Sequence, residues 1–145
     1  MSGAPQRIEL RLPHLLPEPI SHYTDAVWAS GWLWVSGLLA LDAGGTLMAP
    51  GDVLGQAEQV FRNLEGVLEA AGLGFSDVVK VTLYLIDIDD RPVINRARQA
   101  VFGAARPAST LIQVAALAVP GALLEVDAVA VAPNPPAVRD RGVAL

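Results

Sequence analysis

The clearest pattern in the chain is a helical one between residues 52 and 72. Its apolar side chains recur at spacings of three and four and form one stripe, made of Ala57, Val60, Phe61, Leu64, Val67, Leu68 and Ala71. Asp52 precedes the stripe and is placed to accept hydrogen bonds from the free amides at a helix start. Gly72 follows it as a natural stop. The pattern predicts an amphipathic helix that covers a core.

A tight hairpin is predicted shortly before this helix. Two runs rich in tryptophan and valine, 26–29 and 32–37, lie on either side of Ser30 and Gly31. A pair of such residues between two apolar runs is typical of a two-residue hairpin turn. The short alternating stretch from Ile8 to Leu12 can add an edge strand.

Three later runs also predict strands. In residues 78–86, Val79, Val81, Leu83 and Leu85 alternate with Lys80, Thr82 and Tyr84, which is the period of a half-buried strand. Residues 109–114 and 123–131 are further strand-forming runs, and the loop over 118–121 joins them. A proline-rich tail starts at Pro133.

A second, shorter helix is predicted after the acidic run Asp87, Asp89 and Asp90. Its apolar members keep helical spacing and are Val93, Ile94, Ala97 and Val101, and Gly103 ends it. The acids could be read as a metal site, but no calcium-loop spacing follows them. Helix capping explains them better, because acids ahead of a helix complement its free amides and its dipole.

The order of these elements predicts an α+β fold, with two helices packed on one face of a mixed sheet. The chain has 145 residues, which suits one domain over 1–145. Hydrophobic residues make up 52% and charged residues 17%. A chain with so few charges often completes its core by symmetric association, so we expect an oligomer.

Charge and composition narrow the classes of partner. The net charge of -5, with Lys80 as the only lysine, argues against a nucleic-acid partner, although a local arginine patch stays open. The absence of cysteine excludes disulfides, thiolate metal sites and a cysteine nucleophile. The N-terminal segment lacks the apolar core of a signal peptide, and no run reaches the length of a membrane span. We therefore expect a soluble, cytoplasmic protein with no membrane partner.

Glu125 and Asp127 are the first candidates for chemistry. Alternation places both on one face of their strand, opposite Leu124 and Val126, and about 7 Å apart. If both are shielded from water, one of them has a raised pKa and can act as a general acid or base. The alternative is that they lie on the solvent face of an edge strand.

Ser109 and Thr110 open the strand that follows "RP" at 106–107. No base, elbow motif or lysine partner accompanies Ser109, so taken alone these hydroxyls read as a strand start that satisfies local backbone groups. The two histidines, His14 and His22, lack a metal-ligand pattern and are read as surface residues. The tryptophans at 28, 32 and 34 are read as core or interface anchors.

Taken together, these segments resemble the RidA/YjgF family, also called perchloric-acid-soluble proteins. The matching stretches are "SHYTDAV", "WLWVSG", "QAEQVFRNLEGVLEAAG", "DVVKVTLYLIDIDDRPVIN", "VFG", "RPAST" and "LLEVDAVAV", which cover about residues 21–132. The resemblance implies a chorismate-mutase-like fold, assembled as a homotrimer with small-molecule sites in clefts between subunits. It also implies hydrolysis of reactive imines and enamines to a keto acid and ammonia, without a cofactor or metal.

The resemblance also implies roles for single residues. Glu125 would orient the attacking water. Tyr23 would line the cleft, Ser36 would lie near it, and Asn95 would flank it. If the protein is an enzyme of this kind, we expect Tyr23, Ser109 and Thr110 to hold the substrate.

The chain departs from the family at the substrate clamp. Deaminating members have "PAR[ST]", whose arginine binds the substrate carboxylate, and this chain has Ser109 at that position. A hydroxyl does not replace the two charge-assisted hydrogen bonds of a guanidinium, a loss that typically costs about 2 to 5 kcal/mol. Leu38 replaces the usual glutamine after "SG", and "SHY" replaces "GPY". These substitutions make the cleft more apolar. We therefore expect a different ligand, one that is uncharged or that bears a hydroxyl or a carbonyl group.

Two functions stay open at this point. In the first, the protein adds water to a small imine, enamine or related electrophile, with Glu125 positioning the water. In the second, it is a non-catalytic trimer that binds a metabolite or another protein. Arg106 could supply a substitute cation only if its loop turned the side chain inward. Ribonuclease activity, which some relatives have, is disfavoured by the acidic charge and the lack of a histidine pair.

Overall fold

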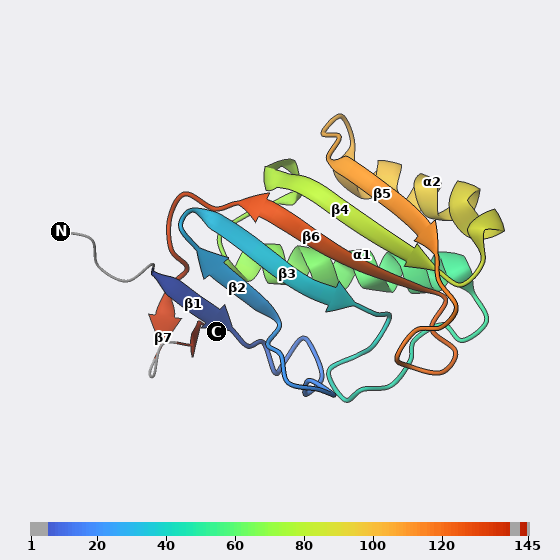
Figure 1. The fold of residues 1–145 in the computed structure, drawn as a ribbon, viewed down its shortest axis with the longest axis horizontal. Helices are drawn as coiled ribbons and strands as arrows, with labels where there is room; N and C mark the ends of the chain where they lie inside the picture. The colour runs from blue at the N-terminus through green and yellow to red at the C-terminus, as the bar shows by residue number, and fades with distance from the viewer. Residues whose placement is uncertain (1–5, 140–142, 145) are drawn as a thin grey trace.

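The protein is a two-layer α+β structure in a computed structural model that describes residues 6–139, 143 and 144 (Figure 1). One layer is an eight-stranded sheet in the order β5-β4-β6-β3-β2-β1-β8-β7. The strands are β1 (Arg7–Leu10), β2 (Ala26–Ala29), β3 (Trp32–Leu38), β4 (Val78–Leu85), β5 (Ala108–Gln113), β6 (Leu124–Val131), β7 (Val138–Arg139) and β8 (Val143–Ala144). β4 and β5 run parallel, as do β1 and β8, whereas the other neighbours are antiparallel. The sheet is therefore mixed, as predicted.

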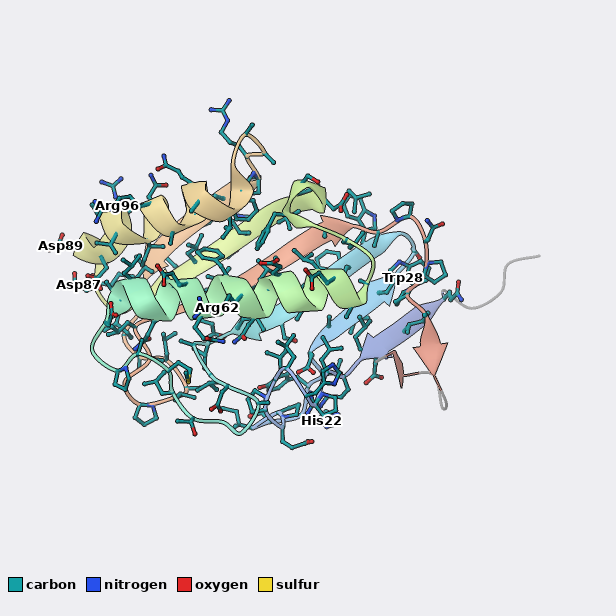
Figure 2. All side chains as sticks on the ribbon, turned by 180° about the vertical axis from the view of Figure 1, so that it is seen from behind. His22, Trp28, Arg62, Asp87, Asp89 and Arg96 are labelled. Carbon is teal, nitrogen blue, oxygen red and sulfur yellow. The ribbon has the colours of Figure 1, made fainter. Side chains whose placement is uncertain are left out.

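The other layer consists of the two predicted helices. α1 (Val53–Ala70) and α2 (Arg91–Phe102) both lie behind the sheet in Figure 1 and in front of it in Figure 2. The helices therefore cover one face, which confirms the expected architecture. Short 3-10 turns, η1 (Phe75–Asp77) and η2 (Ile88–Asp90), precede β4 and α2. We call the helix-bearing side of the sheet the covered face and the other side the open face.

The hairpin between β2 and β3 forms as predicted. Ser30 and Gly31 both have positive φ angles, 49° and 88°. Positive φ at both central residues defines the turn whose twist matches that of the flanking strands. The turn sets the register, with Ala29 opposite Trp32 and Val27 opposite Trp34.

α1 is joined to the loops at the strand ends by two buried amide side chains. Asp52 caps the helix by accepting a hydrogen bond from the Gly55 amide at 3.0 Å. The Gln56 side chain accepts from the Leu123 amide at 2.8 Å and donates to the Gly121 carbonyl at 3.1 Å. Asn63 donates to the carbonyls of Leu39 and Leu41. These bonds satisfy buried polar groups and position the ends of β3 and β6.

The covered face carries the core. In β6, Leu124, Val126, Ala128 and Ala130 are all buried, which confirms the predicted alternation. In β4 the alternation fails at one position: Val79 is exposed, and Val78 is buried in its place. The register shifts between Val78 and Lys80, so a bulge inserts one residue and resets which side chains face inward.

The acids before α2 were expected to cap that helix, but the one cap bond made by a side chain of this run is in the short turn η2 and not in α2. Asp87 accepts a hydrogen bond from the Asp89 amide at 2.9 Å at the start of η2, whereas Asp90, directly before α2, makes no side-chain cap bond. Asp87 and Asp89 lie at the end where α2 begins (Figure 2). α2 ends at Gly103, whose φ is 57°.

One expectation about the N-terminal strand was wrong. β1 was expected at an edge of the sheet, but it lies between β2 and β8. The proline-rich tail contributes two short strands, β7 over residues 138–139 and β8 over residues 143–144. The physical reason is that β1 leaves one row of backbone groups free, and β8 pairs with them in parallel through Glu9 and Leu10.

Neither helix is suited to membrane insertion. Within the described ranges, neither one combines the length and the apolar character that crossing a bilayer requires.

Candidate functional site

Glu125 and Asp127 lie together on the open face, at the centre of the sheet. β6 is paired with β4 on one side and β3 on the other. The alternative that these acids lie on an edge strand is therefore wrong. Both side chains are half-buried, whereas the neighbouring Leu124 and Val126 point into the core.

Glu125 packs against the backbone of Gly37. The register of β3 and β6 shifts between Val35 and Leu38, and Gly37 lies in this irregular stretch. A Cβ atom added at Gly37 would lie 2.8 Å from Cδ of Glu125 and would overlap its Oε1 atom. Gly37 therefore makes room for the Glu125 carboxylate, a role that no pattern within β3 indicates.

The surroundings of Glu125 favour its protonated form. Burial raises the pKa of Glu125, and the nearby charge of Asp127 raises this pKa further. A carboxyl group whose pKa lies closer to neutrality exchanges protons with a substrate more readily. The geometry thus supports the sequence-based hypothesis that one of the two acids has a raised pKa.

Tyr84 adds a third group to this pair. Its hydroxyl donates a hydrogen bond to Oδ2 of Asp127 at 2.8 Å, from the neighbouring strand β4. This bond and burial raise the pKa of Tyr84. Sequence reasoning missed Tyr84 because only the pairing register, with Tyr84 opposite Glu125 and Thr82 opposite Asp127, brings it to the acids.

Tyr23 and Ser36 meet at the end of β3, next to Glu125. They line a small hollow of about 50 Å³ together with Gly37, Leu38 and Asn63. The Ser36 hydroxyl donates to the Thr24 carbonyl at 2.6 Å, whereas the Tyr23 side chain is 47% exposed. Glu125 does not line this hollow, but Gly37 does, and the Glu125 carboxylate lies against Gly37. The hollow and Glu125 therefore adjoin at Gly37.

Ser109, Thr110 and Asn95 lie elsewhere, at the β5 edge of the sheet. β4 separates β5 from β6, so Thr110 lies two strand spacings, about 10 Å, from Asp127. Thr110 pairs with Thr82 on the open face, whereas Ser109 pairs with the buried Val81 and so points to the opposite side. Asn95 is exposed on α2. One chain alone does not unite these residues with Glu125.

Lys80 provides a cation near the β5 edge. Its ammonium group donates a hydrogen bond to Oγ1 of Thr110 at 2.8 Å. In the sequence, Lys80 stands out only as the sole lysine. Its contact depends on the parallel pairing of β4 with β5, which the spacing of residues along the chain does not reveal.

The exposure of the tryptophans and histidines decides between the roles that the sequence left open for them. Trp28 is buried and donates from Nε1 to the Ala132 carbonyl at 2.8 Å, so it is a core anchor. Trp32 and Trp34 are 42% and 54% exposed on the open face. His14 and His22 are exposed, as expected, and His22 lies in the loops before β2 (Figure 2). Across residues 6–139, 143 and 144, no three His, Asp or Glu side chains gather as a metal site would require.

Comparisons with known proteins identify the family to which this chain belongs. A family model described as endoribonuclease L-PSP matches residues 14–132. The chain is 36% identical over 115 residues to the 2-iminobutanoate/2-iminopropanoate deaminase of Mus musculus, covering 79% of this chain and 84% of the relative. The chain belongs to the RidA/YjgF family.

Solved structures of RidA/YjgF proteins share the fold. A putative endoribonuclease L-PSP from Entamoeba histolytica superimposes with a TM-score of 0.80 at 36% identity, covering 87% of this chain and 99% of that one. The YjgF gene product of E. coli gives a TM-score of 0.76 at 29% identity, with coverage of 85% and 97%. The family assignment and the α+β fold expected from the sequence are therefore confirmed.

Proposed function

We propose that this RidA/YjgF protein hydrolyses a small imine or enamine to a carbonyl compound and ammonia, with Glu125 positioning the water. The observation that carries the proposal is the Glu125 carboxylate, half-buried at the centre of the open face with a raised pKa. The mouse relative is a deaminase of 2-iminobutanoate and 2-iminopropanoate, which supports the reaction class.

The proposed reaction needs one group that moves a proton twice. Starting from the protonated imine, Glu125 accepts a proton from water as the water oxygen bonds to the imine carbon and the C=N electron pair moves onto nitrogen, which gives a neutral carbinolamine. The protonated carboxyl then gives this proton to the amine nitrogen. The C–N bond breaks with its electron pair leaving on ammonia, the hydroxyl proton returns to the Glu125 carboxylate as the C=O bond forms, and ammonia takes up that proton to leave as ammonium. A raised pKa suits both steps, because the group must be a base in the first and an acid in the second.

We further propose that the working site lies between copies in a homotrimer. One copy contributes Glu125, Tyr23 and Ser36, and the edge of a neighbour contributes Ser109, Thr110 and Asn95. Two observations support this arrangement. The two groups lie apart in a single chain, and the open face exposes large apolar side chains beside Glu125, namely Trp32, Trp34 and Val131.

The test is ammonia release from freshly generated 2-iminopropionate and from bulkier and uncharged imines. The native protein is compared with Glu125→Gln and with Ser109→Arg, and glutamine keeps the shape of the carboxyl without its proton chemistry. We expect native turnover of at least one imine and a loss of about a hundredfold or more in Glu125→Gln.

The substrate range separates the possible outcomes. Turnover of uncharged imines by the native protein would support a cleft without the carboxylate clamp. Turnover of 2-iminopropionate by Ser109→Arg alone would show a complete cleft that lacks only its cation. No turnover of any imine by either protein, with a ligand recovered from the native protein, would overturn the proposal in favour of a non-catalytic binding trimer.

A further inference from the structure

A groove with arginine side chains lies on the covered face, between α2 and the loop before β5. It has a volume of about 300 Å³ and is lined by Asn95, Arg98, Gln99, Phe102, Arg106 and Pro107, among others. A second hollow continues along α2 and shares Asn95 and Arg98, with Arg91 and Leu111 in its wall. No acidic residue lines either hollow. Four of the ten lysines and arginines of this acidic chain fall between 91 and 106.

Arg98 is the most informative of these residues. It is half-buried, and burial lowers the pKa of its guanidinium. In the part of the chain that the structure describes, the ion pairs are Arg7–Glu9, Arg11–Glu18 and Arg11–Asp25, so Arg98 and Arg106 have no carboxylate within reach. Neither guanidinium donates a hydrogen bond there. A desolvated cation without a partner is costly unless an anion binds to it.

We propose that this groove binds a small organic anion, a carboxylate or a phosphate ester, between the guanidinium groups of Arg98 and Arg106. Guanidinium groups bind both kinds of anion through paired, charge-assisted hydrogen bonds. Asn95 and Gln99 add amide donors one helical turn apart on the same side of α2.

The rest of the groove indicates an organic body on the ligand. Phe102 and Pro107 form an apolar part of the wall, next to the charged part. A volume of this size suits a small metabolite and not a folded partner. An inorganic anion could bind to the arginines, but it would make no contact with this apolar wall.

Nearby acids do not neutralise the two arginines. Asp87, Asp89 and Asp90 lie at the N-terminal end of α2, beside Arg91, whereas Arg106 follows the C-terminal end of the helix. Lys80 lies on the open face with Thr110. In one chain the groove lies on the covered face and Glu125 on the open face, and the two proposed sites share Asn95 alone. Anion binding between Arg98 and Arg106 does not require that any imine be hydrolysed.

The test is a titration of the full-length protein, followed by the ¹H–¹⁵N NMR signals of backbone amides. The probes are benzoate, phenyl phosphate, inorganic phosphate and the uncharged benzyl alcohol. We expect saturable shifts confined to residues around 95–107 with benzoate or phenyl phosphate, weaker binding of inorganic phosphate, and no shifts with benzyl alcohol. The ratio of the affinities for benzoate and phenyl phosphate shows whether the groove prefers a carboxylate or a phosphate ester.

Matched variants make the test specific. Arg98→Met keeps the apolar stem, and both it and Arg106→Gln should weaken binding about tenfold or more. Arg96→Gln is the control, because Arg96 on the same helix lines a different hollow, together with Glu58 and Glu65. Glu125→Gln should bind the probes as the native protein does, even if no imine is hydrolysed.

Three results would overturn the proposal. These are the absence of saturable shifts with either aromatic anion, unchanged binding in the exposed-site variant Arg106→Gln, or equal weakening in Arg96→Gln. Because Arg106 is exposed, its replacement leaves the fold intact and its result decides the matter even if Arg98→Met fails to fold.

Discussion

The two faces of β6 place neighbouring residues in opposite surroundings. On the covered face, Leu124 and Val126 are fully buried beneath the helices. On the open face, Glu125 and Asp127 keep their charges close together, with a tyrosine hydroxyl as a partner. The covered face lowers the free energy of the fold through apolar burial, whereas on the open face burial and the charge of Asp127 disfavour the ionised form of Glu125. The same strand thus carries the apolar core on one side and the candidate catalytic carboxyl on the other.

The largest expected effect comes from breaking the covered face. Leu124→Ala removes a fully buried side chain and leaves a cavity under α1, so it should lower the free energy of unfolding by about 2–5 kcal/mol. The measurement is urea unfolding at pH 7. Its neighbour Glu125→Gln is the matched comparison from the other face.

Glu125→Gln should not lower stability at neutral pH. A folded-state pKa above the unfolded value means that the stabilising contribution is present at low pH and is lost as pH rises through the folded pKa. Glutamine does not ionise, so the variant should gain stability relative to the native protein as pH rises above the unfolded pKa of glutamate, and the gain should be complete above the folded pKa. Equal destabilisation by both substitutions would contradict the division of roles between the faces.

A substitution at Gly37 of β3 should change stability less than Leu124→Ala does. Gly37→Ala places a methyl group where the Glu125 carboxylate lies, and the φ angle of Gly37 is not in the positive range that excludes alanine. The carboxylate can swing away, so stability should change by less than about 0.5 kcal/mol, while misplacing it should slow imine hydrolysis by about a hundredfold.

The control for Gly37→Ala is Gly74→Ala, because a Cβ at Gly74 meets no atom within 4 Å. Assays of ammonia release and urea unfolding on both variants measure the two quantities. Normal turnover in Gly37→Ala would show that the position of Glu125 over this glycine is irrelevant to the reaction.

Assembly through the open face should be sensitive to its tryptophans. Trp34→Ser removes the most exposed of them and should weaken association of the proposed homotrimer by about 2 kcal/mol or more, the usual loss at a central aromatic anchor. Sedimentation at several concentrations gives the association state. Leu54→Ser is the control, since Leu54 is 41% exposed on α1 at the covered side. A trimer that persists unchanged in Trp34→Ser would place the interface elsewhere.

Most of the fold follows from local patterns in the sequence. The stripe of α1, the hairpin at Ser30 and Gly31 and the alternation in β6 each depend on residues close together along the chain. The bulge at Val79 and the pairing of β8 with β1 depend on strands distant in sequence. No spacing rule within one segment contains that information, so these features were missed.

The candidate site shows the same limit. Alternation correctly grouped Glu125 with Asp127, but their central place in the sheet and the Tyr84 hydroxyl come from the register of β4 against β6. Ser109 and Thr110 are neighbours in sequence, yet they point to opposite faces because successive strand residues alternate. Which of the two would meet Glu125 in the proposed homotrimer depends on how the copies assemble, and the pattern within one chain does not reveal that.

The smallest expected effect concerns the charge of Asp127. Burial is the main cause of the raised pKa of Glu125, and Asp127 is the second. Asp127→Asn keeps the shape and removes the negative charge, so the pKa of Glu125 should fall but stay above its ordinary value. Because Glu125 must be ionised to accept a proton from water, the acidic limb of the pH–rate profile should move to lower pH, with little change at pH 8. Glu58→Gln, an exposed acid on α1, should leave the profile unmoved. An unshifted limb in Asp127→Asn would mean that the two carboxylates do not sense each other, and that burial against Gly37 alone sets the proton affinity of Glu125.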